Sequence, residues 1–73
     1  MEKLYDFWIT VQELSEAQSK ELWLQHRSNT IHCTVFPTKA FIYGVATEPK
    51  ITSIIDDIIK LGKDYGLTRT EVK

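Results

Sequence analysis

Few side chains of this sequence could do chemistry. Apart from carboxylates, the side chains of a type that binds metal ions are His26, His32 and Cys33. The sequence also has two adjacent acidic residues, Asp56 and Asp57. Because neighbouring residues of a strand point to opposite faces, His32 and Cys33 cannot readily share an ion. Asp56 and Asp57 diverge by about 100° around an expected helix, which makes them poor partners for general acid/base work. We therefore expect no metal site, interpret Cys33 as a small core residue and place both aspartates on a solvated helix face.

Other catalytic arrangements are equally hard to find. Ser15 has no plausible base nearby in the sequence and is expected to cap a helix. Gly44, Gly62 and Gly66 are isolated from one another, so they cannot form the glycine-rich loop that cradles a phosphate. The sequence therefore predicts a protein that is not an enzyme, with no catalytic residues and no cofactor.

Length and composition narrow the class of protein further. A length of 73 residues predicts a single domain, residues 1–73. The composition, with 42% hydrophobic and 26% charged residues, is typical of a globular protein. A net charge of -1 argues against a strong sequence-independent grip on nucleic acid and against a polybasic membrane patch. Cys33 is the only cysteine, whereas secreted domains this small usually carry several. With no signal-peptide pattern and no long apolar run, we expect a cytoplasmic protein that does not enter the membrane.

The secondary structure is organised around residues 30–47, which read as two strands joined by a turn at Pro37. A strand and a helix are expected on either side of this unit. Ser15 and Gln18 form a capping-box pattern at the start of the first helix, for which we expect Trp23 and Leu24 as core anchors. The expected elements are a strand at 4–14, a helix at 16–27, strands at 30–36 and 39–47, a helix at 49–65 and a strand at 67–72.

The second helix carries the strongest pattern. Its apolar residues follow the spacing of one broad helical stripe: Ile51, Ile54, Ile55, Ile58, Ile59, Leu61 and Tyr65. Gly62 is expected inside this helix, where it would allow close approach to a strand, and Gly66 is expected to end it.

The order strand, helix, strand, strand, helix, strand predicts an α+β, ferredoxin-like split β-α-β fold. Such a fold has a four-stranded antiparallel sheet with two helices on one face, and the strand order is fourth, first, third, second. The helices are then expected to cover Tyr5, Phe7, Ile9, Val11, Ile31, Cys33 and Val35.

Trp8 must then lie on the open face of the sheet. The third strand is ambiguous, because either Phe41 and Tyr43 or Ala40 and Ile42 could share that face. If the aromatic pair does, an exposed cluster forms that predicts an interaction site. The candidate binding residues are Trp8, His32, Phe36, Lys39, Phe41 and Tyr43.

Three uses of this surface are open. A protein–protein contact, either self-association as a homodimer or docking of an inhibitor or adaptor, is the leading interpretation because aromatic residues make good interface anchors. Stacking on single-stranded nucleic acid is the second. Sensing of a small ligand at a dimer interface is the third.

The nucleic-acid alternative rests on a resemblance. Lys39, Phe41 and Tyr43 supply the basic residue and two aromatics of a third-strand motif, and Phe7-Trp8-Ile9 supplies a first-strand aromatic. In these residues the chain resembles the RNA recognition motif family, which implies base stacking by Trp8, Phe41 and Tyr43. Ala40 stands where that family has its first glycine.

Overall fold

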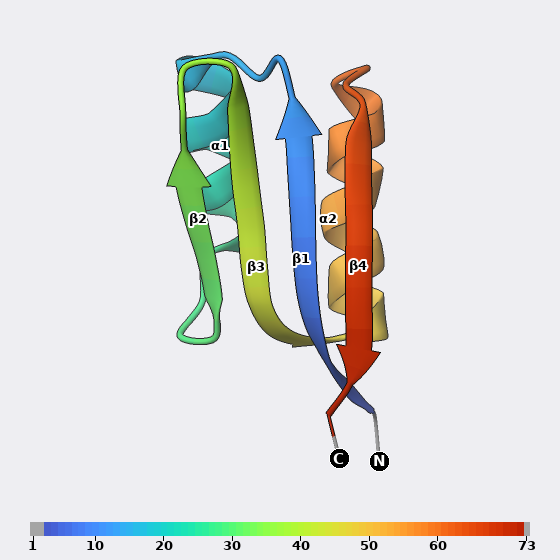
Figure 1. Cartoon of the computed structure of the whole chain (residues 1–73). Coiled ribbons are helices and arrows are strands. Elements are labelled where there is room, and N and C mark those ends of the chain that lie inside the picture. The colour runs from blue at the N-terminus through green and yellow to red at the C-terminus, as the bar shows by residue number, and fades with distance from the viewer. Residues whose placement is uncertain (1–2, 73) are drawn as a thin grey trace.

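The computed structural model describes residues 3–72 of the chain. Its elements are β1 (Leu4–Gln12), α1 (Glu16–His26), β2 (Ile31–Val35), β3 (Lys39–Thr47), α2 (Glu48–Lys60) and β4 (Tyr65–Glu71). All strand pairs are antiparallel, in the order β2-β3-β1-β4. Both helices cover the same face of the sheet (Figure 1). The protein is therefore α+β with a ferredoxin-like split β-α-β arrangement, and β1 and β3 are central, as predicted.

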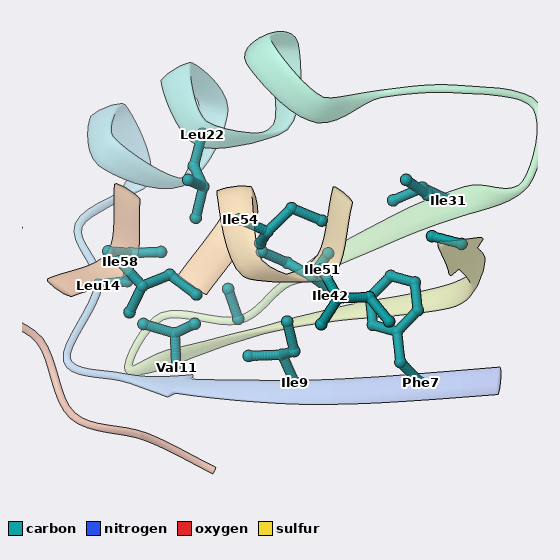
Figure 2. Close-up of a cluster of buried hydrophobic side chains, with 12 residues drawn as sticks. Phe7, Ile9, Val11, Leu14, Leu22, Ile31, Ile42, Ile51, Ile54 and Ile58 are labelled. Atoms are coloured by element: carbon teal, nitrogen blue, oxygen red, sulfur yellow. The ribbon is translucent and has the colours of Figure 1, made fainter. Parts of the chain in front are cut away.

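The helix side of the sheet holds the hydrophobic core. Phe7, Ile9 and Val11 of β1 are buried, and they alternate with exposed or half-buried residues as a strand with one packed face requires. Isoleucines of α2 and Leu22 of α1 point towards them (Figure 2). Val35 is 44% exposed and does not join this core, contrary to expectation. The reason is its position, since Val35 is the last residue of the edge strand β2.

The start of α1 is as predicted, but its buried face is not. Ser15 accepts a hydrogen bond from the Gln18 backbone N–H at 3.1 Å, and the Gln18 side chain accepts one from the Ser15 N–H at 3.2 Å. Trp23 and Leu24, the expected anchors, are exposed. The core-facing row is instead Ser19, Leu22 and His26.

His26 can occupy that row because α2 satisfies both of its ring nitrogens. Its Nε2 lies 2.6 Å from Asp57 Oδ2, and its Nδ1 lies 3.3 Å from Lys50 Nζ. Since the lysine can only donate, Nδ1 accepts and Nε2 donates to the carboxylate. Our expectation of a solvated helix face is therefore right for Asp56, which is exposed, and wrong for Asp57, which joins the two helices.

The second helix is shorter than its apolar pattern indicated. Ile51, Ile54 and Ile58 are completely buried, whereas Ile59 is 56% exposed. The helix ends at Lys60, and Tyr65 begins β4 instead of extending the helical stripe. The misleading feature is that Leu61 and Tyr65 continue the helical spacing beyond the true end.

Gly62, not Gly66, is the glycine that follows the helix. Gly62 has φ +70° and donates its N–H to the Ile59 carbonyl at 2.9 Å, an arrangement typical of helix ends. Gly66 lies within β4. The prediction that Gly62 sits inside the helix against a strand is also wrong, since no atom would contact a Cβ built on it. Neither helix in residues 3–72 is long and apolar enough to cross a membrane.

Candidate interaction face

The third-strand ambiguity is resolved by burial on the helix side of the sheet. Ala40 is completely buried and Ile42 is 2% exposed, so both lie beneath the helices. Phe41 and Tyr43 therefore point to the open face, and the alternative that placed them in the core is wrong. The strand register sets Tyr43 opposite Trp8 of β1 on one side and opposite His32 of β2 on the other.

The rings of this face form one connected group. Trp8 and Tyr43 are stacked, with ring centroids 4.7 Å apart and an interplanar angle of 21°. Phe41 lies diagonally across from Trp8 at 5.2 Å, and His32 lies 5.6 Å from Tyr43. The aromatic face thus spans β1, β3 and β2, and each ring is held by a neighbour on the adjacent strand.

Two further residues lie at the end of the group, Phe36 in the turn between β2 and β3 and Lys39 at the start of β3. Phe36 packs edge-on against Phe41 at 5.5 Å, and Lys39 Nζ lies 5.4 Å from the Phe41 ring centroid. The turn is closed by a hydrogen bond from the Phe36 N–H to the Lys39 carbonyl at 2.8 Å. All six sequence-predicted binding residues are therefore brought together. We call this group of Trp8, His32, Phe36, Lys39, Phe41 and Tyr43 the aromatic face.

On the side of β1 away from β3, the strand β4 contributes small polar residues to the open face. Thr68 of β4 lies opposite Trp8, and Thr70 lies opposite Asp6. Asp6 and Lys39 are therefore the charged residues that these registers place around the rings. An exposed apolar surface rimmed by hydroxyls and single charges is suited to contact with another macromolecule.

The side chains that could do chemistry are dispersed. His32 is exposed on the open face, while Cys33 is half-buried on the helix side against the core. Burial raises the pKa of the Cys33 thiol above its ordinary value of 9.0, which disfavours the reactive thiolate. Within residues 3–72 no three His, Cys, Asp or Glu side chains gather in a way that could hold a metal ion.

A second surface was not anticipated from the sequence. A groove runs between α1 and β2, at the outer edge of the sheet. Trp23 and Cys33 line both halves of this groove and lie where the halves meet. Glu16 and Lys20 lie at the end near the β2–β3 turn, and Arg27 lies at the other end. The available signal was the spacing of residues 16, 20, 23 and 27, which places them on one side of a helix.

Comparisons with protein-family models, with curated proteins and with solved structures found no match for this chain.

Proposed function

We propose that this protein is a small non-catalytic binding module that docks a partner protein through the aromatic face. The observation that carries the proposal is the continuous run of rings across three strands, on the side of the sheet opposite α1 and α2. Trp8 and Phe36, at two margins of the run, are 43% and 44% exposed. Burying such rings against a partner contributes much of the binding free energy in interfaces of this kind.

The arrangement of the rings favours a protein partner over single-stranded nucleic acid. Base stacking needs an aromatic face that is open to the base, whereas Trp8 is stacked on Tyr43 and flanked by Phe41. The backbone of nucleic acid also needs a cationic groove, whereas Asp6 offsets the charge of Lys39 on the open face and the whole chain has a net charge of -1. Binding of a single strand, with Lys39 near its phosphates, remains the second candidate.

The proposal is tested by affinity capture from the source cell with three baits: the natural chain, Trp8→Ser combined with Tyr43→Ser, and Leu24→Ser. The Leu24 variant is the matched control, because it removes an exposed apolar side chain from α1, on the helix side of the sheet. We expect the natural chain and the control to retain the same protein, and the double variant to lose it at least tenfold. Retention by all three baits alike would exclude the aromatic face as the docking surface.

Nucleic acid is tested separately by titrating a short single-stranded oligonucleotide and following tryptophan fluorescence at two salt concentrations. Affinity that falls steeply with salt and disappears in Lys39→Ala would replace the protein partner with nucleic acid. An apolar protein interface should respond little to the same change of salt.

A further inference from the structure

The outer edge of β2 presents unpaired backbone groups whose direction is set by the β2–β3 ladder. Phe36 donates its N–H to Lys39, and Thr30 accepts from the Val45 N–H at 3.0 Å. Because an antiparallel ladder alternates, even-numbered residues of β2 bond to β3 and odd-numbered ones point outward. Cys33 and Val35 therefore direct both N–H and C=O away from the sheet, where no strand of residues 3–72 pairs with them.

At both ends of this edge the backbone cannot pair with another strand. Ile31 also points outward, but its N–H already faces the Ser28 carbonyl at 3.4 Å, and Ser28 forms a bridge to it. Pro37, at the other end, has no N–H and lies in the turn that leads the chain towards β3. The accessible edge is thus the short segment from Cys33 to Val35, centred on Thr34.

This edge lacks charged side chains and proline, two of the features with which edge strands avoid pairing. Residues 31–35 contain no charged residue and no proline. The opposite edge strand, β4, differs, since Arg69 is paired with Glu48 at 3.0 Å and Glu71 with Lys3 at 3.7 Å. Strand addition is therefore expected at β2 and disfavoured at β4.

We infer that β2 pairs antiparallel with β2 of a second copy of this chain, about a two-fold axis at Thr34, and joins the two sheets into one. In this register the Cys33 N–H donates to the Val35 carbonyl of the other copy, and the Val35 N–H donates to its Cys33 carbonyl. The register centred on Cys33 is excluded, because it would set Val35 of the second copy against Ile31, whose outer side Ser28 occupies.

The charges along the groove favour a second copy as the occupant. Glu16 lies at the β2–β3 turn end of the groove and Arg27 at the opposite end, with Lys20 between Glu16 and Trp23. A two-fold axis reverses one groove relative to the other, so Glu16 of each copy lies beside Arg27 of its partner. Trp23, 37% exposed and in contact with the Arg27 guanidinium at 5.8 Å, lies between these ends and becomes covered. The inference concerns the strand edge and does not depend on the aromatic face.

Disulfide trapping tests the register. Residues directly opposite in a non-hydrogen-bonded antiparallel pair have Cα atoms about 4.5 Å apart, which a disulfide can span. In a Cys33→Ser background, Thr34→Cys should form a covalent dimer rapidly on mild oxidation. Thr70→Cys, on the open face of the other edge strand, is the matched control and should form no covalent dimer. Equal cross-linking of both variants, or of neither, would overturn the register.

Light scattering over a dilution series tests the interface itself. Val35→Pro removes an outward N–H without removing a β2–β3 hydrogen bond, so it should weaken the dimer at least tenfold while circular dichroism shows an intact fold.

Glu16→Arg and Arg27→Glu should each weaken the dimer, and the double variant should restore it. A natural chain that is monomeric throughout, or a dimer lost in Trp8→Ser but unchanged in Val35→Pro, would refute edge pairing. The latter result would place self-association on the aromatic face instead.

Discussion

At the scale of single residues, Gly44 shows how one position can constrain the sheet. It has φ +143°, and a Cβ built on it would lie 1.9 Å from the Thr30 carbonyl oxygen. No side chain can be accommodated there without moving the backbone that enters β2. The aromatic face depends on this approach, since β2 carries His32 beside Tyr43.

We expect Gly44→Ala to lower the free energy of unfolding by at least about 2 kcal/mol, because it adds a steric clash to a disfavoured φ. Gly66→Ala is the control, since a Cβ there meets no atom within 4 Å. Urea denaturation compares the two variants. Equal losses for both would show that the close approach at Gly44 is not maintained in solution.

Cys33 leads to a pH dependence whose sign follows from its surroundings. Burial raises the pKa of the Cys33 thiol, so the folded protein holds this proton more tightly than the unfolded chain does. The associated stability is complete below the pKa of the unfolded thiol and is lost as the pH rises through the folded pKa. Between neutral pH and pH 10, the natural chain should lose more stability than Cys33→Ala. Parallel pH profiles from urea titrations would contradict this.

At the scale of elements, α2 holds the sheet and α1 is held partly by α2. The isoleucines of α2 pack directly onto β1 (Figure 2). In contrast, Leu22 is the single large apolar residue that α1 buries in the core, and two polar residues complete its buried row. The interhelical contact of His26 with Asp57 thus supplements weak apolar packing.

We expect Ile58→Ala to cost about 2–5 kcal/mol as a truncation in a closed core. Ile59→Ala, on the adjacent and mostly exposed residue, should cost less than about 0.5 kcal/mol. Chemical denaturation of the two variants measures the difference. Similar costs would mean that the buried face of α2 has been misplaced.

The contact between the helices gives a second prediction. Asp57→Ala leaves the Nε2–H of buried His26 without its acceptor, so we expect a loss of about 1–3 kcal/mol. Asp56→Ala, on the exposed neighbour, should change stability by no more than about 0.5 kcal/mol. A double-mutant cycle with His26→Ala measures the coupling energy directly, and a value near zero would remove this contact from the forces that hold α1.

At the scale of the whole molecule, the sheet separates a face that stabilises the fold from a face that is available for binding. Phe7 and Trp8 are consecutive in β1, yet Phe7 is 4% exposed beneath the helices and Trp8 is 43% exposed on the open face. The aromatic face can therefore change with little effect on the core. Edge pairing at β2 would also place two aromatic faces side by side on one continuous sheet.

We expect Phe7→Ala to cost about 3–5 kcal/mol and Trp8→Ala about 0.5–1.5 kcal/mol, the latter from the loss of stacking on Tyr43. Thermal unfolding of the two variants tests this two-sided arrangement. A large loss from Trp8→Ala would show that the aromatic face is part of what stabilises the fold, and would weaken the proposal that it serves binding.

The sequence alone determined the order of elements, the central strands and the capped start of α1, because alternation along β1, the capping box and the isoleucine spacing are local signals. It also named the six residues of the aromatic face, but it left open which side of β3 they occupied. Both sides of that strand are apolar, so only packing beneath the helices could place Ala40 and Ile42 in the core.

Other features required the tertiary structure for a similar reason. The buried row of α1 contains polar residues that no hydrophobic pattern would select, and His26 is acceptable there only because Lys50 and Asp57 reach it from α2. The end of α2 depends on the positive φ of Gly62, although the apolar spacing continues beyond it. The unpaired edge of β2 exists only once the strand order is known. Contacts between residues far apart in the chain decided each of these points, whereas the signals read from the sequence are local.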